Sequence, residues 1–222
     1  MMRALEIQLV NAPIGYGEAW AYQREAHRQR VAGERPDLLF LLEHRPVYTL
    51  GRSATRDHLL WNQARLTEAG IECVSCDRGG DITYHGPGQL VGYPIVHLPE
   101  AGLHVVEYVT ALEEVLLRTA ADFGVQANRD PRNRGIWVGN TKLAALGIRI
   151  SHQVAMHGFA FNVSPKLSDF QGIIPCGLNG VGVTSLEQLL GKAPAMEDVI
   201  SSVIRHFREV FRYDQVRELP SL

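Results

Sequence analysis

Two segments of the chain combine residue types that can do chemistry with a backbone that can admit a ligand. The stretch 78–89, RGGDITYHGPGQ, holds five glycine or proline residues around Arg78, Asp81 and His85. Glycines let a ligand approach bare backbone, and a few polar side chains then fix its orientation. The second segment, IIPCGL, places Cys176 between a proline that fixes φ and a glycine that frees it. A ligand-binding loop and a candidate nucleophile together predict an enzyme.

Cys176 has two interpretations. Most free cysteines are small buried apolar residues, but the irregular Pro-Cys-Gly setting favours a thiol nucleophile. Since a free thiol with a pKa of ~8.5 is only a few per cent thiolate at neutral pH, catalysis requires a basic or cationic neighbour. The candidates are His85, His152, His157 and Lys142. Lys142 opens an almost uncharged strand, so it either reaches solvent or acts beside the thiol, as an ammonium or as a desolvated proton acceptor.

Three further groups of residues each have a structural and a functional interpretation. Cys73 and Cys76 fall in a predicted strand, where an offset of three points them to opposite faces, so we expect neither a redox pair nor a metal site. His85 either hydrogen-bonds its own loop or orients a substrate carbonyl. The remaining group is either a solvated loop or a basic patch that guides an acidic partner: Arg129, Arg132 and Arg134.

Composition excludes several classes of protein. The chain has 222 residues, 45% of them apolar and 21% charged, which suits one globular domain. Its net charge of −2 gives no general attraction to nucleic acid or anionic membrane. No apolar run approaches the ~18 residues of a membrane-spanning helix, and the N-terminal segment lacks a secretory signal. With three cysteines and no export signal, a reducing cytoplasm is the expected location.

Apolar periodicity predicts the elements that position these residues. Strands are expected at 4–10, 38–43, 47–50, 71–75, 90–98, 135–138, 143–150 and 154–163. The strands 38–43 and 47–50 are expected to pair with each other, and 78–89 is expected to be a loop. Helices are expected at 17–31, at 104–123 with Gly124 as a C-terminal cap, and at 196–210. A capping box of Thr184 and Glu187 opens a further short helix that ends near Gly191.

Strand 154–163 has an informative alternation. His157, Phe159, Phe161 and Val163 alternate with small or polar residues at 158, 160 and 162, so one face has room for a ligand chain. Strands interspersed with two long helices, neither strictly alternating nor all-β, predict an α/β fold with a mixed sheet. No repeat or linker divides the chain, so we expect a single domain spanning 1–222.

Four segments resemble the lipoyl(octanoyl) transferase family. They are RGGDITYHGPGQLVGYPI at 78–95, KLAALGIRIS at 142–151, HGFAFNV at 157–163 and PCGL at 175–178. They lie in the family's order, the first is long and highly specific, and the similarity covers about 44–189. The resemblance implies a mixed β-sheet flanked by helices, similar to the catalytic domains of biotin protein ligase and lipoate ligase.

The resemblance also implies an activity and its residues. It implies that the chain is a single octanoyltransferase catalytic domain. Octanoyl would pass from acyl carrier protein to a specific lysine on the lipoyl domain of a 2-oxoacid dehydrogenase acyltransferase subunit, or on glycine-cleavage H protein. Cys176 would form the acyl thioester and Lys142 would tune its pKa and shuttle protons, with no metal, cofactor or ATP. The acyl-binding walls would be Arg78, Gly79, Gly80, Asp81, Ile82, Thr83, Tyr84, His85, Ala145, Leu146, Gly147, Gly158, Phe159 and Ala160.

Three alternatives lead to different experiments. An ATP-dependent lipoate or biotin ligase on the same fold would activate a free acid and need no cysteine. A cysteine hydrolase would use His85 or His157 as base and water as the acyl acceptor. A non-catalytic module would bind an acylated carrier whether or not its thiol were alkylated.

Overall fold

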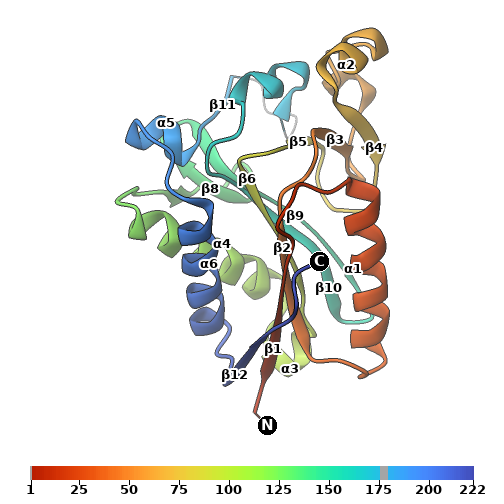
Figure 1. Cartoon of the computed structure of the whole chain (residues 1–222), viewed down its shortest axis with the longest axis vertical. Helices are drawn as coiled ribbons and strands as arrows, with labels where there is room; N and C mark the ends of the chain where they lie inside the picture. Colours follow the sequence, from red (N-terminus) through yellow and green to blue (C-terminus); the bar gives the residue numbers. More distant parts are fainter. Residues whose placement is uncertain (1, 176–179) are drawn as a thin grey trace.

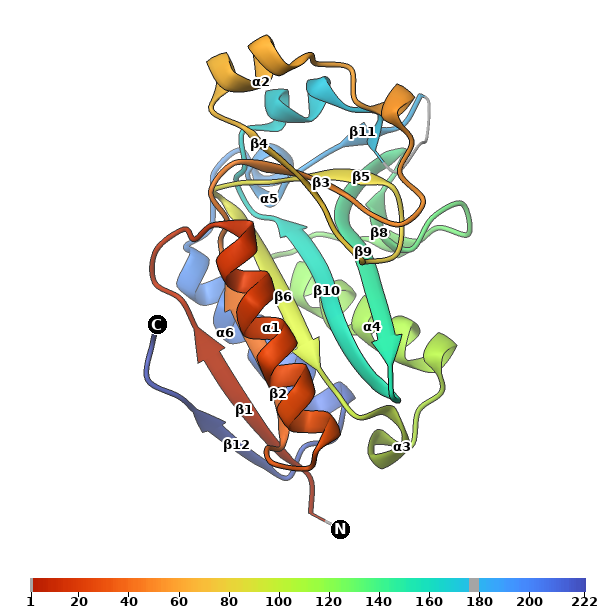
Figure 2. The same ribbon diagram turned by 90° about the vertical axis from the view of Figure 1, so that its right-hand side faces the viewer.

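The computed structural model describes residues 2–175 and 180–222, and within them two sheets meet at one end of the molecule. The larger sheet has the strand order β12-β1-β2-β6-β10-β9-β8-β7, with β11 beside β9. The smaller sheet, in the order β4-β3-β5, lies across the upper end of the larger one (Figures 1 and 2). Strands β12, β1 and β2 run parallel and β2, β6, β10, β9, β8 and β7 antiparallel in turn. The expected mixed sheet is confirmed.

The predicted strands and helices occur in the predicted order, with further short elements between and after them. The larger sheet consists of β1 (Ala4–Leu9), β2 (Asp37–Leu42), β6 (Gln89–Ile95), β7 (Asn128–Arg129), β8 (Gly135–Val138), β9 (Thr141–Ser151), β10 (Val154–Asn162), β11 (Gly182–Val183) and β12 (Gln215–Glu218). The smaller sheet consists of β3 (Val47–Leu50), β4 (Glu72–Ser75) and β5 (Ile82–His85). The helices are α1 (Tyr16–Val31), α2 (Gln63–Ala69), α3 (Leu98–Ala101), α4 (Val105–Asp122), α5 (Leu186–Leu190) and α6 (Met196–Val210), with 3-10 turns η1 (Arg56–His58) and η2 (Leu167–Gly172).

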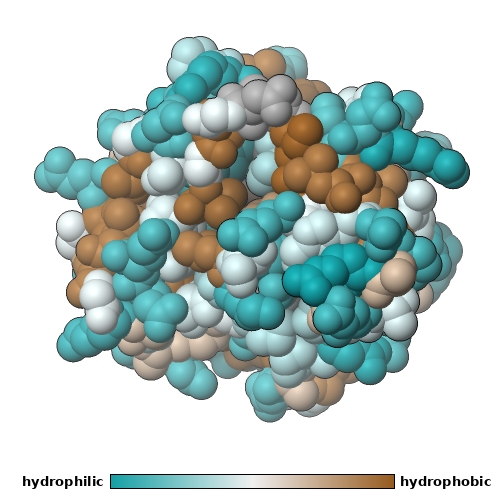
Figure 3. All heavy atoms as spheres, turned by 90° about the horizontal axis from the view of Figure 1, so that it is seen from above, coloured by the Kyte–Doolittle hydropathy of each residue, from teal (hydrophilic) through white to brown (hydrophobic). Residues whose placement is uncertain are grey.

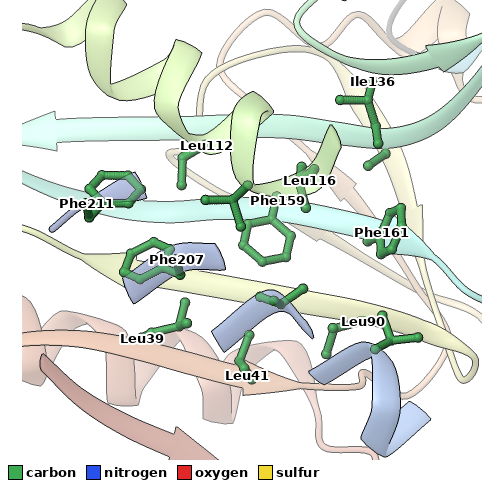
Figure 4. Close-up of a cluster of buried hydrophobic side chains, with 14 of the residues drawn as sticks. Leu39, Leu41, Leu90, Leu112, Leu116, Ile136, Phe159, Phe161, Phe207 and Phe211 are labelled. Carbon is green, nitrogen blue, oxygen red and sulfur yellow. The ribbon is translucent and has the colours of Figure 1, made fainter. Parts of the chain in front are cut away.

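Helices cover both faces of the larger sheet. α1 lies on one face and α4 and α6 lie on the other (Figures 1 and 2). Strand β2 is buried along its whole length, which explains its unbroken apolar run after Asp37. On the α4–α6 side, Phe159 and Phe161 of β10 join the helix residues Leu112 and Phe207 in one buried cluster (Figure 4). Each such fully buried side chain contributes about 1.5–3 kcal/mol, so this face is the main apolar core.

The smaller sheet corrects two of the sequence expectations. β3 pairs with β4 and β5, not with β2, so the predicted pairing of 38–43 with 47–50 is wrong. The segment 78–89 is not all loop, because Ile82–His85 forms β5 and pairs with β3. The chain leaves β2, crosses to the smaller sheet, and returns to the larger sheet only at β6.

The C-terminal third differs from expectation at several places. The short helix α5 begins one residue later than predicted, because the side chain of Ser185, not Thr184, accepts from the Gln188 N–H at 3.2 Å. Strand β12, which was not predicted, pairs in parallel with β1 at the sheet edge. The end of α4 agrees with expectation, since Gly124 follows it with a φ of +77°.

Two glycines bring the sheets into close contact. The Gly79 N–H donates to the Ile148 carbonyl of β9 at 2.9 Å. A Cβ on Gly79 would lie 2.8 Å from that oxygen, and one on Gly147 would lie 2.9 Å from the Gly79 carbonyl. Only residues without a Cβ allow this approach, and the contact holds Arg78 against β9. Within residues 2–175 and 180–222, no helix has the length and apolarity needed to cross a membrane.

Candidate active site

A cavity lies between the two sheets. Every predicted acyl-binding residue except Gly79 and Tyr84 lines it. The other lining residues are Tyr16, Tyr93, Asn133 and His157. The end of the molecule that carries the smaller sheet shows apolar patches between polar side chains (Figure 3).

The two exceptions have structural roles. Gly79 holds the loop on β9 through the close contact described above. Tyr84 is buried in the smaller sheet, where its hydroxyl donates to Asp169 Oδ2 at 3.0 Å and its ring packs edge-on against Phe170. Neither residue lines the main cavity.

A second, smaller cavity adjoins the first. The two share Thr83, Ala145 and Ala160 as lining residues, and the smaller one also reaches Lys142 and Pro175. Pro175 directly precedes Cys176 in sequence. Cys176 itself, with the rest of 176–179, lies outside the described residues. Lys142 therefore borders a cavity that adjoins the main one.

Lys142 is buried. Of the two interpretations that the sequence left open for this lysine, burial excludes the one in which its side chain reaches solvent. The residue is 5% exposed. Its ammonium donates to Asn133 Oδ1 and, at 3.3 Å, to the Arg134 carbonyl, and lies 4.8 Å from the centroid of the Trp137 ring. A buried ammonium must be held by such groups, because desolvation is otherwise costly. Asn133 was not predicted, since an asparagine in a polar turn carries no signal that separates it from its neighbours.

Arg78 is the second buried cation of the site. Its guanidinium donates from Nε and Nη2 to Thr49 Oγ1, at 3.1 and 2.9 Å, and from Nη1 to the Gly79 carbonyl at 3.0 Å. These bonds hold the planar guanidinium group of Arg78 against strand β3. Thr49, like Asn133, escaped the sequence analysis because it lies in an apparently ordinary strand.

A chain of hydrogen bonds fixes the protonation of His85. The Thr184 carbonyl can only accept, so Asn162 Nδ2 donates to it at 2.9 Å and Asn162 Oδ1 faces Gln89 Nε2 at 2.9 Å. Gln89 Oε1 must then accept from His85 Nδ1, at 2.8 Å. The proton is therefore on Nδ1, and Nε2, 3.4 Å from Thr49 Oγ1, is an acceptor.

His85 is also kept neutral. Burial, reinforced by His44 and by the nearby Arg78 cation, holds the pKa of His85 well below its ordinary value. A base with so low a pKa is a poor proton acceptor, which argues against His85 as the base of a hydrolase. Its hydrogen bonds to Gln89 support the structural interpretation of this histidine.

His157 departs from the predicted alternation of β10. Its φ of +59° breaks the strand's regularity. Its ring lies near Tyr93 and Trp20, on the α1 side, whereas Phe159 and Phe161 join the core cluster with α4 and α6. His157 Nε2 is 2.7 Å from Asp77 Oδ1, yet burial outweighs this partner and lowers the pKa of His157. The expectation that all of these side chains share a face is wrong at His157.

The remaining candidates line neither cavity. His152 is in the exposed turn after β9, Cys73 is exposed, and Cys76 is partly buried with its thiol 3.5 Å from the Leu50 carbonyl. The arginine cluster is balanced locally, which favours the solvated-loop interpretation. Its ion pairs are Arg129 with Glu113 and Glu114, Arg132 with Asp130, and Arg134 with Glu113.

Comparison with known proteins gives a consistent result. Residues 15–208 match the lipoyl protein ligase A/B catalytic domain family. An octanoyltransferase from Rubrobacter xylanophilus is 46% identical over 210 residues, covering 93% of this chain and 94% of the relative. An octanoyltransferase from Caldicellulosiruptor saccharolyticus is 44% identical over 200 residues, covering 89% and 85%.

Solved structures with low sequence identity share the fold. A lipoate-protein ligase A bound with ATP superposes with a TM-score of 0.81 at 14% identity, covering 100% of this chain and 90% of that one. A biotin protein ligase from Aquifex aeolicus gives 0.54 at 12% identity, covering 96% and 71%. The predicted likeness of fold to both ligases is confirmed. On the sequence relationships above, the chain belongs to the octanoyltransferases, acyltransferase enzymes of the lipoyl protein ligase A/B catalytic domain family.

Proposed function

We propose that the chain, acting as one catalytic domain over 1–222, transfers octanoyl from acyl carrier protein to a lysine of a lipoyl domain or glycine-cleavage H protein. The observation that carries this proposal is the pair of adjoining cavities. The smaller one reaches Lys142 and Pro175, next to Cys176, and the larger one has small and apolar residues of β9 and β10 along one wall. We place the reaction in the cytoplasm, whose reducing environment keeps Cys176 a thiol.

The cavity dimensions suit a medium acyl chain. On β9 and β10 the pairs Ala145–Ala160 and Gly147–Gly158 follow one another along the cavity wall. Ala160 and His157 are three residues apart, roughly 10 Å along a strand. The seven bonds of an extended eight-carbon chain span roughly 8 Å at the rise per bond of an extended backbone. Burying about six methylenes contributes roughly 5 kcal/mol to binding.

The reaction would proceed in two exchanges at one sulfur. The Cys176 thiolate attacks the carrier thioester, a new carbon–sulfur bond forms, and the carrier's phosphopantetheine thiolate leaves and takes a proton. The deprotonated amine of the target lysine then attacks the enzyme thioester, forming an amide and releasing the Cys176 thiolate. Lys142 would give a proton to the leaving thiolate in the first step and receive one from the attacking amine in the second. Because the amide is more stable than the thioester, no ATP is consumed.

A transfer assay tests the proposal. Purified protein, octanoyl carrier protein and an acceptor lipoyl domain should yield octanoylated lysine without ATP. Cys176→Ala should abolish the product, and Lys142→Met should reduce it by roughly 100-fold or more, the usual size of a general acid–base contribution. Lys166→Met is the matched control, since that lysine is exposed and pairs with Asp169. A requirement for ATP with free octanoate would contradict the proposal and indicate a ligase.

A further inference from the structure

The stretch of chain that leads to Cys176 is paired with the backbone at the end of η1. The Ile174 N–H donates to the His58 carbonyl at 2.9 Å, and Cys176 follows Ile174 by two residues in the sequence. A displacement of 58–60 would therefore displace 172–174 as well. The other contacts of this pairing are the bond from the Leu60 N–H to the Gly172 carbonyl, at 2.8 Å, and an antiparallel bridge between Leu59 and Ile173.

His58 joins this pairing to the wall of the main cavity. Its Nδ1 donates to Asp81 Oδ2, and Asp81 lines the main cavity. Among the described residues, this is the only side-chain hydrogen bond between η1 and the glycine-rich segment 78–89. His58 thus contacts the cavity wall through its ring and Ile174 through its backbone.

The Asp81 carboxylate is held at both oxygens. Oδ1 accepts from the Ile82 N–H at 2.7 Å, and Oδ2 accepts from His58. A carboxylate beside an apolar ligand is costly unless its oxygens have partners, so the His58 bond also stabilises Asp81 in the cavity wall. The side chains of His58 and Asp81 are 26% and 11% exposed, so this pair is screened less than a fully exposed one.

We propose that His58 and Asp81 are positioning residues for octanoyl transfer. Their hydrogen bond holds 172–174, and with it the chain that leads to Cys176, against the glycine-rich wall of the main cavity. Neither side chain forms a covalent bond or transfers a proton in this role. Because the bond orders the chain that carries the nucleophile, its loss should slow the chemical step more than it weakens binding of the carrier. This inference rests on the proposed function.

Steady-state transfer of octanoyl from carrier to a lipoyl domain tests the ring of His58. His58→Leu removes the donor, so kcat should fall by roughly 3- to 15-fold with KM for the carrier unchanged within about 2-fold, as expected for one charge-assisted hydrogen bond at a partly exposed site. His58→Asn should restore most of kcat, because the amide Nδ2 lies close to the position of the ring Nδ1 and also donates. Asp57→Ala is the matched control, because Asp57 is an exposed residue of the same turn.

A second variant tests the same bond from its other side. Asp81→Ala removes the acceptor and should also lower kcat. The double variant, His58→Leu with Asp81→Ala, should be no slower than the slower single variant, because both changes remove one shared bond. Amide hydrogen exchange, followed by mass spectrometry, should become faster in 172–174 for His58→Leu and stay unchanged for Asp57→Ala, since the pairing with 58–60 would be weakened.

The outcomes separate this inference from the proposed function. If wild type transfers octanoyl and His58→Leu does so with the same kcat, the inference is wrong. It is equally wrong if His58→Asn is as slow as His58→Leu, because the imidazole itself would then be required, or if the effects of the two single variants multiply in the double variant. If wild type transfers no octanoyl, the proposed function fails, and the positioning inference fails with it.

Discussion

Ala145 of β9 pairs directly with Ala160 of β10, and these two small residues line both cavities. Thr83 also lines both cavities. In the proposed reaction, an acyl chain attached near Lys142 enters the main cavity past these three residues. The size of the side chain at this pair therefore controls access to the main cavity.

Enlarging Ala145 should block medium chains selectively. Ala145→Leu adds three carbons beside both cavities, so octanoyl transfer should fall by roughly 5- to 150-fold, since overpacking a fitted site costs about 1–3 kcal/mol. Transfer of butanoyl, whose chain ends before the interior, should change much less. Steady-state kinetics with both carrier-bound substrates would measure this, with Ala121→Leu on the exposed side of α4 as control. Equal losses for both chains would show that the acyl chain does not pass Ala145.

Asn133 should position Lys142. Its Oδ1 accepts from the Lys142 ammonium, so Asn133→Ala removes one charge-assisted hydrogen bond, worth about 1.5–3 kcal/mol. We expect kcat to fall by roughly 10- to 100-fold with little change in KM. Asn140→Ala is the control, because Asn140 is exposed and bonds Arg132 and the Gly180 carbonyl instead. A change in KM alone would assign Asn133 to binding rather than to positioning.

The contact between the sheets depends on Gly147. A Cβ there would meet the Gly79 carbonyl at 2.9 Å and the Arg78 side chain at 3.2 Å, so the loop must move. Gly147→Ala should lower the free energy of unfolding by about 1–3 kcal/mol, as expected for overpacking. Gly17→Ala is the matched control, because nothing lies within 4 Å of its added Cβ and alanine favours the helix. Urea unfolding of both variants would measure the difference, and equal stabilities would contradict the close packing.

Stability should depend on pH through buried neutral histidines. Burial lowers the pKa of His44 from 6.5 to about 4, and it lowers those of His85 and His157 in the same direction. As pH falls below 6.5, the unfolded chain binds these protons first, so stability is lost progressively down to the folded-state pKa. His44 alone accounts for about 3 kcal/mol across this window.

Urea unfolding at pH 7.5 and pH 5 would measure this loss. His44→Gln should flatten the pH dependence while lowering stability at pH 7.5, since Nδ1 and Nε2 bond the Ile14 carbonyl and Tyr93 Oη. A wild-type free energy of unfolding that stays constant between these pH values would contradict the assignment of neutral buried histidines.

Patterns within a few neighbouring residues predicted most of the longer strands and helices. The pairing of strands that are far apart in the sequence was harder to predict. The periodicity of α4 and α6 follows from burial of one helix face, and the unbroken apolar run of β2 follows from burial of both strand faces. The partners of β3 do not, because Val47 pairs with Glu72 and His85 and the sequence does not encode that register locally. The glycine-rich segment conceals β5 for the same reason.

Some residues of the site could be predicted from sequence motifs, and others could be found only in the folded structure. Residues in distinctive motifs, such as Arg78 and Lys142, were identified, and the structure places them at the two adjoining cavities. Thr49 and Asn133, which hold those two cations, were missed because a threonine in a strand and an asparagine in a turn are unremarkable until the chain folds. His157 was assigned to the wrong face because its positive φ is not visible in an alternating pattern.

The central claim is that Cys176 carries the acyl group between donor and acceptor. Intact-mass measurement after incubation with octanoyl carrier protein, without acceptor, tests it most directly. We predict that wild type gains the mass of one octanoyl group and loses it when a lipoyl domain is added, while Cys176→Ala gains nothing. An unmodified wild-type mass under conditions of active transfer, or an octanoyl adduct that persists in Cys176→Ala, would contradict the account.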